Sequence, residues 1–287
     1  MKTNRYFEDK TVLSFEVFPP KATTPIDTIY QTLEGLKKLS PDFISVTYGA
    51  GGSENSNATI QIARTIKERY HTESVAHLPC IGQSKESLRH QLSQLQEAGI
   101  ENILALRGDR RPGLAEGDFR YATELISFIK EVGDFHVLAA CYPEVHQEAD
   151  GAINDIRHLK AKVDAGAGQL ISQLFFDNEA FYRFRERTEL AGIHVPIEAG
   201  IMPVVNRKQI ERIVSLCHAS LPKKFLTIME KYESSPEAMR DAGIAYANDQ
   251  IIDLLANGVD GIHLYTMNQP YIATKIYEAI HRLLPFK

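Results

Sequence analysis

The chain has 287 residues, 44% of them hydrophobic, so it can bury a large core. Its net charge of −5 argues against a general nucleic-acid binder, and no apolar run is long enough to cross a bilayer. Three dispersed cysteines, Cys80, Cys141 and Cys217, suit neither a disulfide framework nor a zinc ribbon, and we interpret them as buried, reduced thiols. Because the N-terminal stretch is polar, we expect a cytoplasmic protein with no membrane or nucleic-acid partner.

One pattern recurs along the chain, in which short apolar runs alternate with helical stretches. The runs predicted as strands are 12–18, 43–49, 74–79, 102–107, 136–142, 169–176, 196–201 and 261–266. Helical periodicity is clear in 148–165, with Ile153, Ile156, Leu159 and Val163 on one face, and in 270–284, with Ile272, Ile276, Ile280 and Leu283. Ser84 and Pro270 are typical of helix starts. No linker or shift in composition interrupts the pattern, so we expect one domain over 1–287.

Eight strands that alternate with helices predict an α/β protein with parallel strands, and eight strands are the number that closes a (β/α)8 TIM barrel. An open, doubly wound sheet is the alternative. A sheet of that kind that bound a dinucleotide would usually carry a glycine-rich fingerprint after its first strand, whereas this chain has PPKATTP there. The pattern therefore favours the barrel.

Alternation along each strand predicts which side chains point into the barrel. The predicted inward residues at the C-terminal strand ends are Glu16, Thr47, His77, Arg107, Gln173 and Tyr265. On the fourth strand this assignment places Leu104 and Leu106 toward the helices. A single inward polar residue often only satisfies a backbone group, but six at one end of different strands indicate a functional site, because barrel enzymes catalyse reactions at that end.

The segment LALRGDR, residues 104–110, ends a buried run in two opposite charges around a glycine. We interpret Arg107 as an anion-binding side chain, Gly108 as a point of close approach to a ligand, and Asp109 as a fixed negative charge over the mouth. The same Arg-Gly-Asp letters occur in cell-adhesion loops. That reading requires a secreted protein with an exposed loop, and the N-terminal stretch does not indicate secretion.

A set of motifs covers essentially the whole chain in order: SFEVFPPK, SVTYGAGG, AHLPCIG, ALRGD, YPEVHQEA, LKAKVDAGA, QLFFD and HLYTMN. In sequence and spacing they resemble bacterial methylenetetrahydrofolate reductases. The combination of FEVFPP, ALRGD and YPEVH is specific rather than a short chance match. The chain resembles the compact bacterial form, a catalytic barrel without an added regulatory domain.

The resemblance implies a (β/α)8 barrel with noncovalent FAD at its mouth. It implies reduction of 5,10-methylenetetrahydrofolate to 5-methyltetrahydrofolate with NADH or NADPH, which supplies methyl groups for methionine synthesis. The implied route is ping-pong: the nicotinamide reduces the flavin and leaves, and the folate then binds the same face. A homodimer or homotetramer is also expected by family analogy.

The resemblance assigns two catalytic residues. Glu16, the glutamate of FEVFPP, would be the general acid that protonates N10 of the folate and opens its five-membered ring to an iminium ion. Asp109 would lie near the flavin and the reacting folate, where its charge favours the cationic iminium and lowers the flavin potential. Gln173 and Tyr265 would contact the folate.

The flavin contacts implied by the family are Thr47, His77, Arg107, Gly108, Asp109, Ala140, Tyr142, His146, Asp155 and Lys162. Asp155 and Lys162 lie seven residues apart, hence on one helix face. A carboxylate there can hold a ribose hydroxyl while an ammonium group meets a diphosphate. In an unassigned helix the same two residues would be interpreted as solvated charges.

Two positions depart from the family pattern. Met229 stands where a well-known member has a stacking phenylalanine, and it would pack less rigidly on a nicotinamide or pterin. Gln269 stands where that relative has an arginine. If the arginine contacts the folate tail, this chain must use another group. Both positions are kept as substrate-binding candidates with Glu16, Gln173 and Tyr265.

Other functions are disfavoured by particular features. A flavin barrel that oxidises an amino acid, such as proline dehydrogenase, shares the architecture, but the FEVFPP context of Glu16 argues against it. A nonenzymatic adhesion or scaffold protein would not bind flavin. A metal hydrolase is disfavoured because no His, Asp and Glu set has ligand spacing, and no metal site is expected. The choice between NADH and NADPH stays open.

Overall fold

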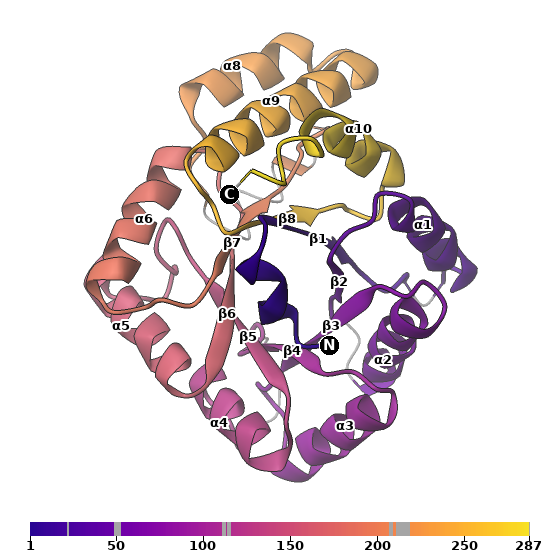
Figure 1. Cartoon of the computed structure of the whole chain (residues 1–287), viewed down its shortest axis with the longest axis vertical. Coiled ribbons are helices and arrows are strands. Elements are labelled where there is room, and N and C mark those ends of the chain that lie inside the picture. The colour runs from indigo at the N-terminus through magenta and orange to yellow at the C-terminus, as the bar shows by residue number, and fades with distance from the viewer. Residues whose placement is uncertain are drawn as a thin grey trace.

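Eight parallel strands close into a barrel in the order of the chain, and helices surround it (Figure 1). The computed structural model describes residues 1–21, 23–48, 53–110, 113, 116–206, 209–210 and 219–286. The strands are β1 (Val12–Val17), β2 (Phe43–Val46), β3 (Glu73–Pro79), β4 (Asn102–Leu106), β5 (His136–Cys141), β6 (Ala167–Ser172), β7 (Ile197–Ile201) and β8 (Gly261–Tyr265). The predicted α/β barrel is confirmed.

Helices follow the strands around the outside of the barrel. They are α1 (Asp27–Lys37), α2 (Ser53–Glu68), α3 (Lys85–Glu97), α4 (Ala122–Val132), α5 (Gly151–Asp164), α6 (Asn178–Leu190), α8 (Lys223–Tyr232), α9 (Pro236–Ala256) and α10 (Pro270–Ile280), with a short 3-10 helix, η1 (Thr3–Glu8), before β1. The Ser84 side chain caps α3 by accepting a hydrogen bond from Ser87 N, and Pro270 begins α10, as predicted. These caps fix where the helices begin.

The core has an outer layer between strands and helices and an inner layer within the barrel. On β1, Leu13, Phe15 and Val17 belong to the outer layer, as predicted. The inner layer at the N-terminal end of the strands combines η1 with six strands: Phe7, Val12, Phe43, Val75, Leu104, Leu138 and Ile171. The inside of the barrel is therefore apolar toward the N-terminal ends of the strands, and polar side chains lie toward the C-terminal ends.

The alternation predicted for β4 was wrong. Leu104 packs in the inner layer with Leu106 against it, whereas Ile103 and Ala105 pack toward the helices. Arg107 comes directly after the strand and lines a cavity next to α4 and α5. The strand is apolar on both faces, so polarity alone gave no way to choose between the two registers.

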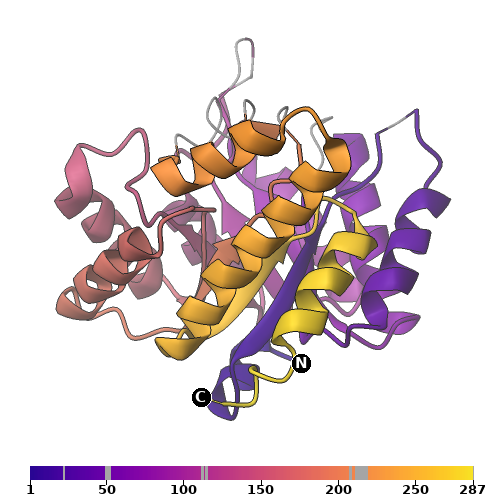
Figure 2. The same ribbon diagram turned by 90° about the horizontal axis from the view of Figure 1, so that it is seen from above.

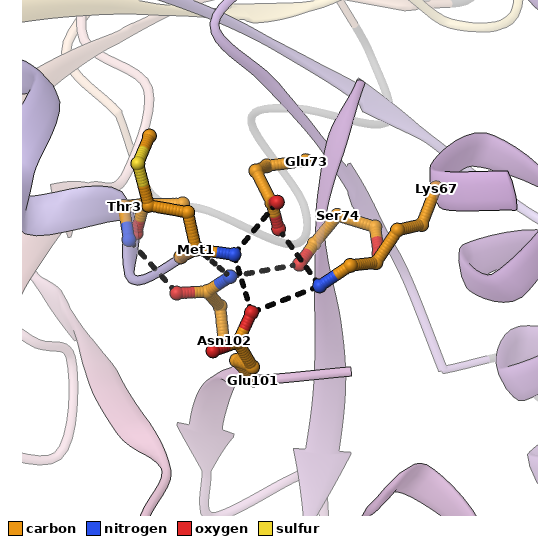
Figure 3. Close-up of polar contacts among 7 residues, drawn as sticks. All are labelled: Met1, Thr3, Lys67, Glu73, Ser74, Glu101 and Asn102. Atoms are coloured by element: carbon orange, nitrogen blue, oxygen red, sulfur yellow. Dashed lines mark hydrogen bonds and ion pairs between the residues drawn. The ribbon is translucent and has the colours of Figure 1, made fainter. Parts of the chain in front are cut away.

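The N-terminal segment closes the end of the barrel opposite the mouth (Figures 1 and 2). The amino group of Met1 pairs with the carboxylates of Glu73 and Glu101, and Lys67 pairs with the same two carboxylates (Figure 3). Asn102 accepts a hydrogen bond from Thr3 N and donates to the Met1 carbonyl. These contacts join the chain end to β3, β4 and α2.

Two further expectations have mixed outcomes. In α5, Leu159 is buried and Ile156 and Val163 pack against the core, but Ile153 is 72% exposed. Of the cysteines, Cys80 and Cys141 are buried free thiols, while Cys217 lies outside the described residues.

No helix among the described residues is long and apolar enough to span a membrane.

Candidate active site at the barrel mouth

A cavity of about 610 Å³ opens beside the C-terminal ends of β4 and β5, next to α4 and α5. Six of the predicted flavin contacts line it: Arg107, Ala140, Tyr142, His146, Asp155 and Lys162. They come from three separate segments of the chain, and the (β/α)8 closure brings them together. The volume lies in the ordinary range for small-molecule sites.

Lys162 and Asp155 share the face of α5 that lines this cavity, as their spacing predicted. The Lys162 ammonium donates a hydrogen bond to the Ala140 carbonyl at 2.9 Å and lies 5.8 Å from the centre of the Tyr142 ring. Burial lowers the pKa of Lys162, against the opposing effect of Asp155. The result is a partly desolvated positive charge in the wall of the cavity, which is suited to an anionic ligand.

Arg107 forms a bidentate ion pair with Glu148, with Nη1 to Oε2 at 2.5 Å and Nη2 to Oε1 at 2.7 Å. This hydrogen-bonded pairing raises the pKa of Arg107 and lowers the pKa of Glu148. His146 lies beside them and contacts Tyr142 edge-on, with the centres of the two rings 4.6 Å apart. Burial and the neighbouring Arg107 charge lower the pKa of His146, which favours its neutral form.

The Arg-Gly-Asp turn follows β4 directly. Gly108 has φ of +88°, and a Cβ there would lie 3.0 Å from Ile81 Cγ2 and 3.1 Å from Pro79 Cβ. The turn therefore requires glycine for two reasons: the backbone at this position is left-handed, and a side chain there would press against the end of β3. Asp109 is exposed beyond this turn. The pKa of Arg107 is raised mainly by its hydrogen bonds to Glu148 and that of Tyr142 mainly by burial, and the Asp109 charge adds a smaller effect in the same direction to both.

Inside the mouth, Glu16 faces two histidines. Its Oε2 lies 3.6 Å from His77 Nε2 and 3.7 Å from His263 Nε2. Among the described residues neither Nε2 atom has a hydrogen-bond partner, and both histidines are buried. Burial lowers the pKa of His77 to about 4, so this histidine is neutral near pH 7. The Glu16 side chain thus points into the mouth between these two histidines, as the alternation along β1 predicted.

Sequence reasoning missed a polar network directly beneath Glu16. Ser14 Oγ lies 2.6 Å from both His263 Nδ1 and Glu198 Oε1, and Gln169 Nε2 donates to Glu198 Oε2 at 2.8 Å. All four side chains are fully buried. The signal was present in the strand PIEAGI, where a glutamate sits between residues that face the helices. Burial raises the pKa of Glu198 to about 7.

The remaining predicted mouth residues are also at strand ends. Tyr265 donates its hydroxyl proton to the Ser172 carbonyl at 2.8 Å, and Gln173 Oε1 accepts from Leu174 N at 2.9 Å. Thr47 N donates to the Val17 carbonyl at 2.9 Å. Thr47, Gln173 and Tyr265 are partly exposed at the mouth, where a ligand can reach them.

Met229 and Gln269, the two positions that depart from the family pattern, occupy different environments. Met229 is 3% exposed in a cluster with Leu174, Phe176, Phe225 and other apolar residues, and Tyr265 packs against that cluster. Gln269 is exposed and precedes α10. Met229 is therefore a packing residue of the cluster that Tyr265 contacts, and Gln269 faces solvent. The described residues hold no group of three or more His, Cys, Asp or Glu side chains suited to a metal ion.

The sequence of this chain is similar to known proteins over nearly its whole length. The family model described as methylenetetrahydrofolate reductase matches residues 2–281. The chain is 40% identical over 264 residues to the 5,10-methylenetetrahydrofolate reductase of Pectobacterium carotovorum subsp. carotovorum, covering 92% of this chain and 88% of that protein. It is 38% identical over 271 residues to that of Escherichia coli K12, covering 94% and 90%.

A solved structure also shares the fold. An uncharacterised protein from Clostridium thermocellum, described as binding two copies of 5-methyl-5,6,7,8-tetrahydrofolic acid, superposes with a TM-score of 0.68. It has 13% sequence identity and covers 99% of both chains, so the likeness concerns the barrel alone. The sequence matches extend over nearly the whole length of the chain and of its bacterial relatives. The chain therefore belongs to the methylenetetrahydrofolate reductase family.

Proposed function

We propose that this protein reduces 5,10-methylenetetrahydrofolate to 5-methyltetrahydrofolate by a ping-pong reaction that uses FAD and NADH or NADPH. The product would supply methyl groups for methionine synthesis. The observation that carries the proposal is the arrangement at the mouth, where Glu16 lies inside the barrel and the cavity at β4 and β5 collects six predicted flavin contacts. The family membership supplies the substrate.

The residues of the cavity fit FAD by their chemistry. Lys162 and Arg107 provide positive charge for a diphosphate, and Asp155 provides an acceptor for a ribose hydroxyl. Tyr142 and His146 form one aromatic wall. When bound, FAD would accept a hydride from the nicotinamide and pass it to the folate. The turn at Gly108 and Asp109 would lie beside it at the end of β4.

The protein's own residues would prepare the folate for reduction. Glu16 would give a proton to N10 of the folate, and the exposed carboxylate of Asp109 would favour the cation that forms when the ring opens. His77 is neutral because of its burial, so it does not add a competing positive charge beside that cation. Gln173 and Tyr265 would hold the pterin from the ends of β6 and β8.

The nucleotide donor is named for some of the plant relatives. A plant relative from Arabidopsis thaliana, 35% identical over 277 residues, is named methylenetetrahydrofolate reductase (NADH) 1. This chain covers 47% of that longer protein. We propose NADH or NADPH as the donor, in a cytoplasmic homo-oligomer.

An anaerobic stopped-flow experiment tests the function directly. The purified protein is loaded with FAD, reduced with NADH or NADPH, and then mixed with 5,10-methylenetetrahydrofolate. Bleaching followed by return of the flavin absorbance on adding folate is the expected result, and the faster nucleotide identifies the donor. Bleaching without return would reject the folate as substrate, and no flavin binding would reject the whole assignment.

A further inference from the structure

We propose that Glu198 stores a proton for Glu16 and delivers it through Ser14 and His263 while ligand covers the mouth. The inference rests on the function proposed above, in which Glu16 loses one proton to the folate in each turnover. A carboxylate beneath a bound flavin and folate has little access to solvent, so an internal proton source would keep it active.

The geometry forms a continuous path. Glu198 Oε1 and His263 Nδ1 each lie 2.6 Å from Ser14 Oγ, and His263 Nε2 lies 3.7 Å from Glu16 Oε2. The pairing of β1 with β8 sets Ser14 opposite His263 and Glu16 opposite Tyr265. The first two steps are already within hydrogen-bond distance, and the last requires Glu16 to approach His263 by about 1 Å.

The orphaned Nε2 of His263 is the observation that gives the path a direction. This histidine is fully buried, and its Nδ1 is engaged by Ser14, yet among the described residues its Nε2 has no hydrogen-bond partner. Leaving a buried polar atom unmatched costs about 1–3 kcal/mol. A carboxylate 3.7 Å away, on the side where substrate would bind, is the natural partner for that atom during the reaction.

The protons balance along this path. Protonated Glu198 donates to Ser14 Oγ as the Ser14 hydroxyl proton passes to His263 Nδ1. The proton on His263 Nε2 then passes to Glu16. The final state has an anionic Glu198, an unchanged serine, the other neutral tautomer of His263 and a protonated Glu16. When the mouth reopens, the same steps in reverse return the proton to Glu198, and solvent water at the open mouth supplies a new proton to Glu16.

The surroundings of Glu198 suit a group that changes its charge. Ser14 from β1, Gln169 from β6 and His263 from β8 face it directly, and Asp42 is a more distant carboxylate. Burial raises the pKa of Glu198 to about 7, despite the opposing effects of His263, Ser14 and Gln169. A carboxyl with that pKa holds a proton about half the time near neutral pH.

The path ends at Glu198 on the side away from the mouth. Gln169 joins Glu198 to Thr3, whose Oγ1 donates to Gln169 Oε1 at 2.8 Å. An amide group does not pass protons as a hydroxyl or an imidazole does, so Gln169 separates the relay from the N-terminal segment. Thr3 therefore offers a matched control that breaks a buried hydrogen bond of the same network without breaking the relay.

The test measures the folate half-reaction in a single turnover. Prereduced Glu198→Gln protein is mixed with 5,10-methylenetetrahydrofolate at pH values from about 6 to 9. We expect the rate of flavin reoxidation to fall roughly tenfold near pH 8 and its alkaline limb to move to lower pH, because Glu16 then no longer receives from Glu198 the proton that it passes to the folate. Flavin reduction by the nucleotide is expected to keep its rate.

Controls separate a proton path from a structural role. Ser14→Ala interrupts the path but keeps the carboxyl group of Glu198. We expect it to shift the pH profile of flavin reoxidation as Glu198→Gln does. If Glu198→Gln fails to fold, the Ser14→Ala profile alone tests the relay. Thr3→Val must lower thermal stability without moving the profile. If the pH profile of flavin reoxidation in Glu198→Gln or Ser14→Ala is the same as that of the unchanged protein, Glu198 is not the proton source. Loss of folate-driven reoxidation in the unchanged protein would instead refute the proposed function.

Discussion

Arg107 and Glu148 are joined by two parallel hydrogen bonds across the rim of the β4–β5 cavity. Arg107 is at the end of β4 and Glu148 precedes α5, so the pair holds two segments of the cavity wall together. Glu148 also neutralises the side chain that we assign to the cofactor phosphates. The ion pair and the bound anion would therefore compete for one guanidinium group.

Glu148→Gln is expected to tighten FAD binding about two- to fivefold, the scale of a partly exposed ion pair, because Arg107 is released and a negative charge is removed. Flavin fluorescence titration of the cofactor-free protein measures this affinity. Glu179→Gln, on exposed α6, is the matched charge control. Weaker binding in Glu148→Gln would mean that the pair preorganises Arg107 instead of masking it.

Lys162→Met should weaken FAD binding by about ten- to a hundredfold, because a charge-assisted hydrogen bond to phosphate is lost in a partly desolvated site. Lys160→Met removes an equal charge from the same helix, where Lys160 pairs with Asp164. Titration of both variants with FAD, with thermal unfolding as a check on folding, separates local from general effects. Equal affinities in the two variants would remove Lys162 from the cofactor site.

Glu16→Gln should leave reduction of the flavin by the nucleotide largely intact and slow the folate step by at least about a hundredfold, the usual contribution of a general acid. Stopped-flow measurement of the two half-reactions gives both rates from one preparation. Gln keeps the size of the side chain between His77 and His263, so packing changes little. Equal losses in both half-reactions would reject the general-acid role.

Asp109→Asn should raise the flavin potential and keep or increase the rate of flavin reduction while slowing the folate step. The physical reason is the loss of a negative charge beside the flavin and the developing cation. Asp109 is exposed, so the substitution should leave the barrel intact. Equilibration with a dye of known potential measures the first effect, and an unchanged folate rate would exclude Asp109 from the reaction.

His77→Gln should make the cofactor-free protein more resistant to acid. Burial lowers the pKa of His77 to about 4, below its ordinary value of 6.5, so the folded state takes up this proton only at lower pH than the unfolded state. Stability from the neutral histidine is therefore present above pH 6.5 and lost as the pH falls toward 4. As the pH falls from about 7.5 to about 4.5, the unfolding free energy of the variant should rise by about 2–3 kcal/mol relative to that of the unchanged protein.

Urea unfolding of both proteins at the two pH values gives this difference. Glu198 also titrates in the window, with its pKa raised to about 7 by burial, and it stabilises the fold as the pH falls from 7 toward 4.5. Its contribution is common to both proteins and cancels in the comparison. A difference that stays constant with pH would show that His77 titrates as an exposed histidine does.

Much of the site could be predicted because its residues follow strands or share a helix face. The spacing of Asp155 and Lys162 placed them on one helix face, the family resemblance assigned that face to the cofactor, and both residues line the cavity. Glu16 was placed inside the barrel by alternation on a strand with polar and apolar faces. Leu104 and Leu106 were placed wrongly because both faces of β4 are apolar, and only pairing with β3 and β5 sets its register.

The sequence by itself determined the number and order of the strands and their alternation with helices, because hydrophobic periodicity and capping are local properties of the chain. It also determined the family, through motifs spread along nearly the whole length. Only the tertiary structure decided that Ser14, Glu198 and His263 form one buried network and that Arg107 pairs with Glu148. Those contacts join residues up to 249 positions apart, and closure of the barrel alone brings them within hydrogen-bond distance.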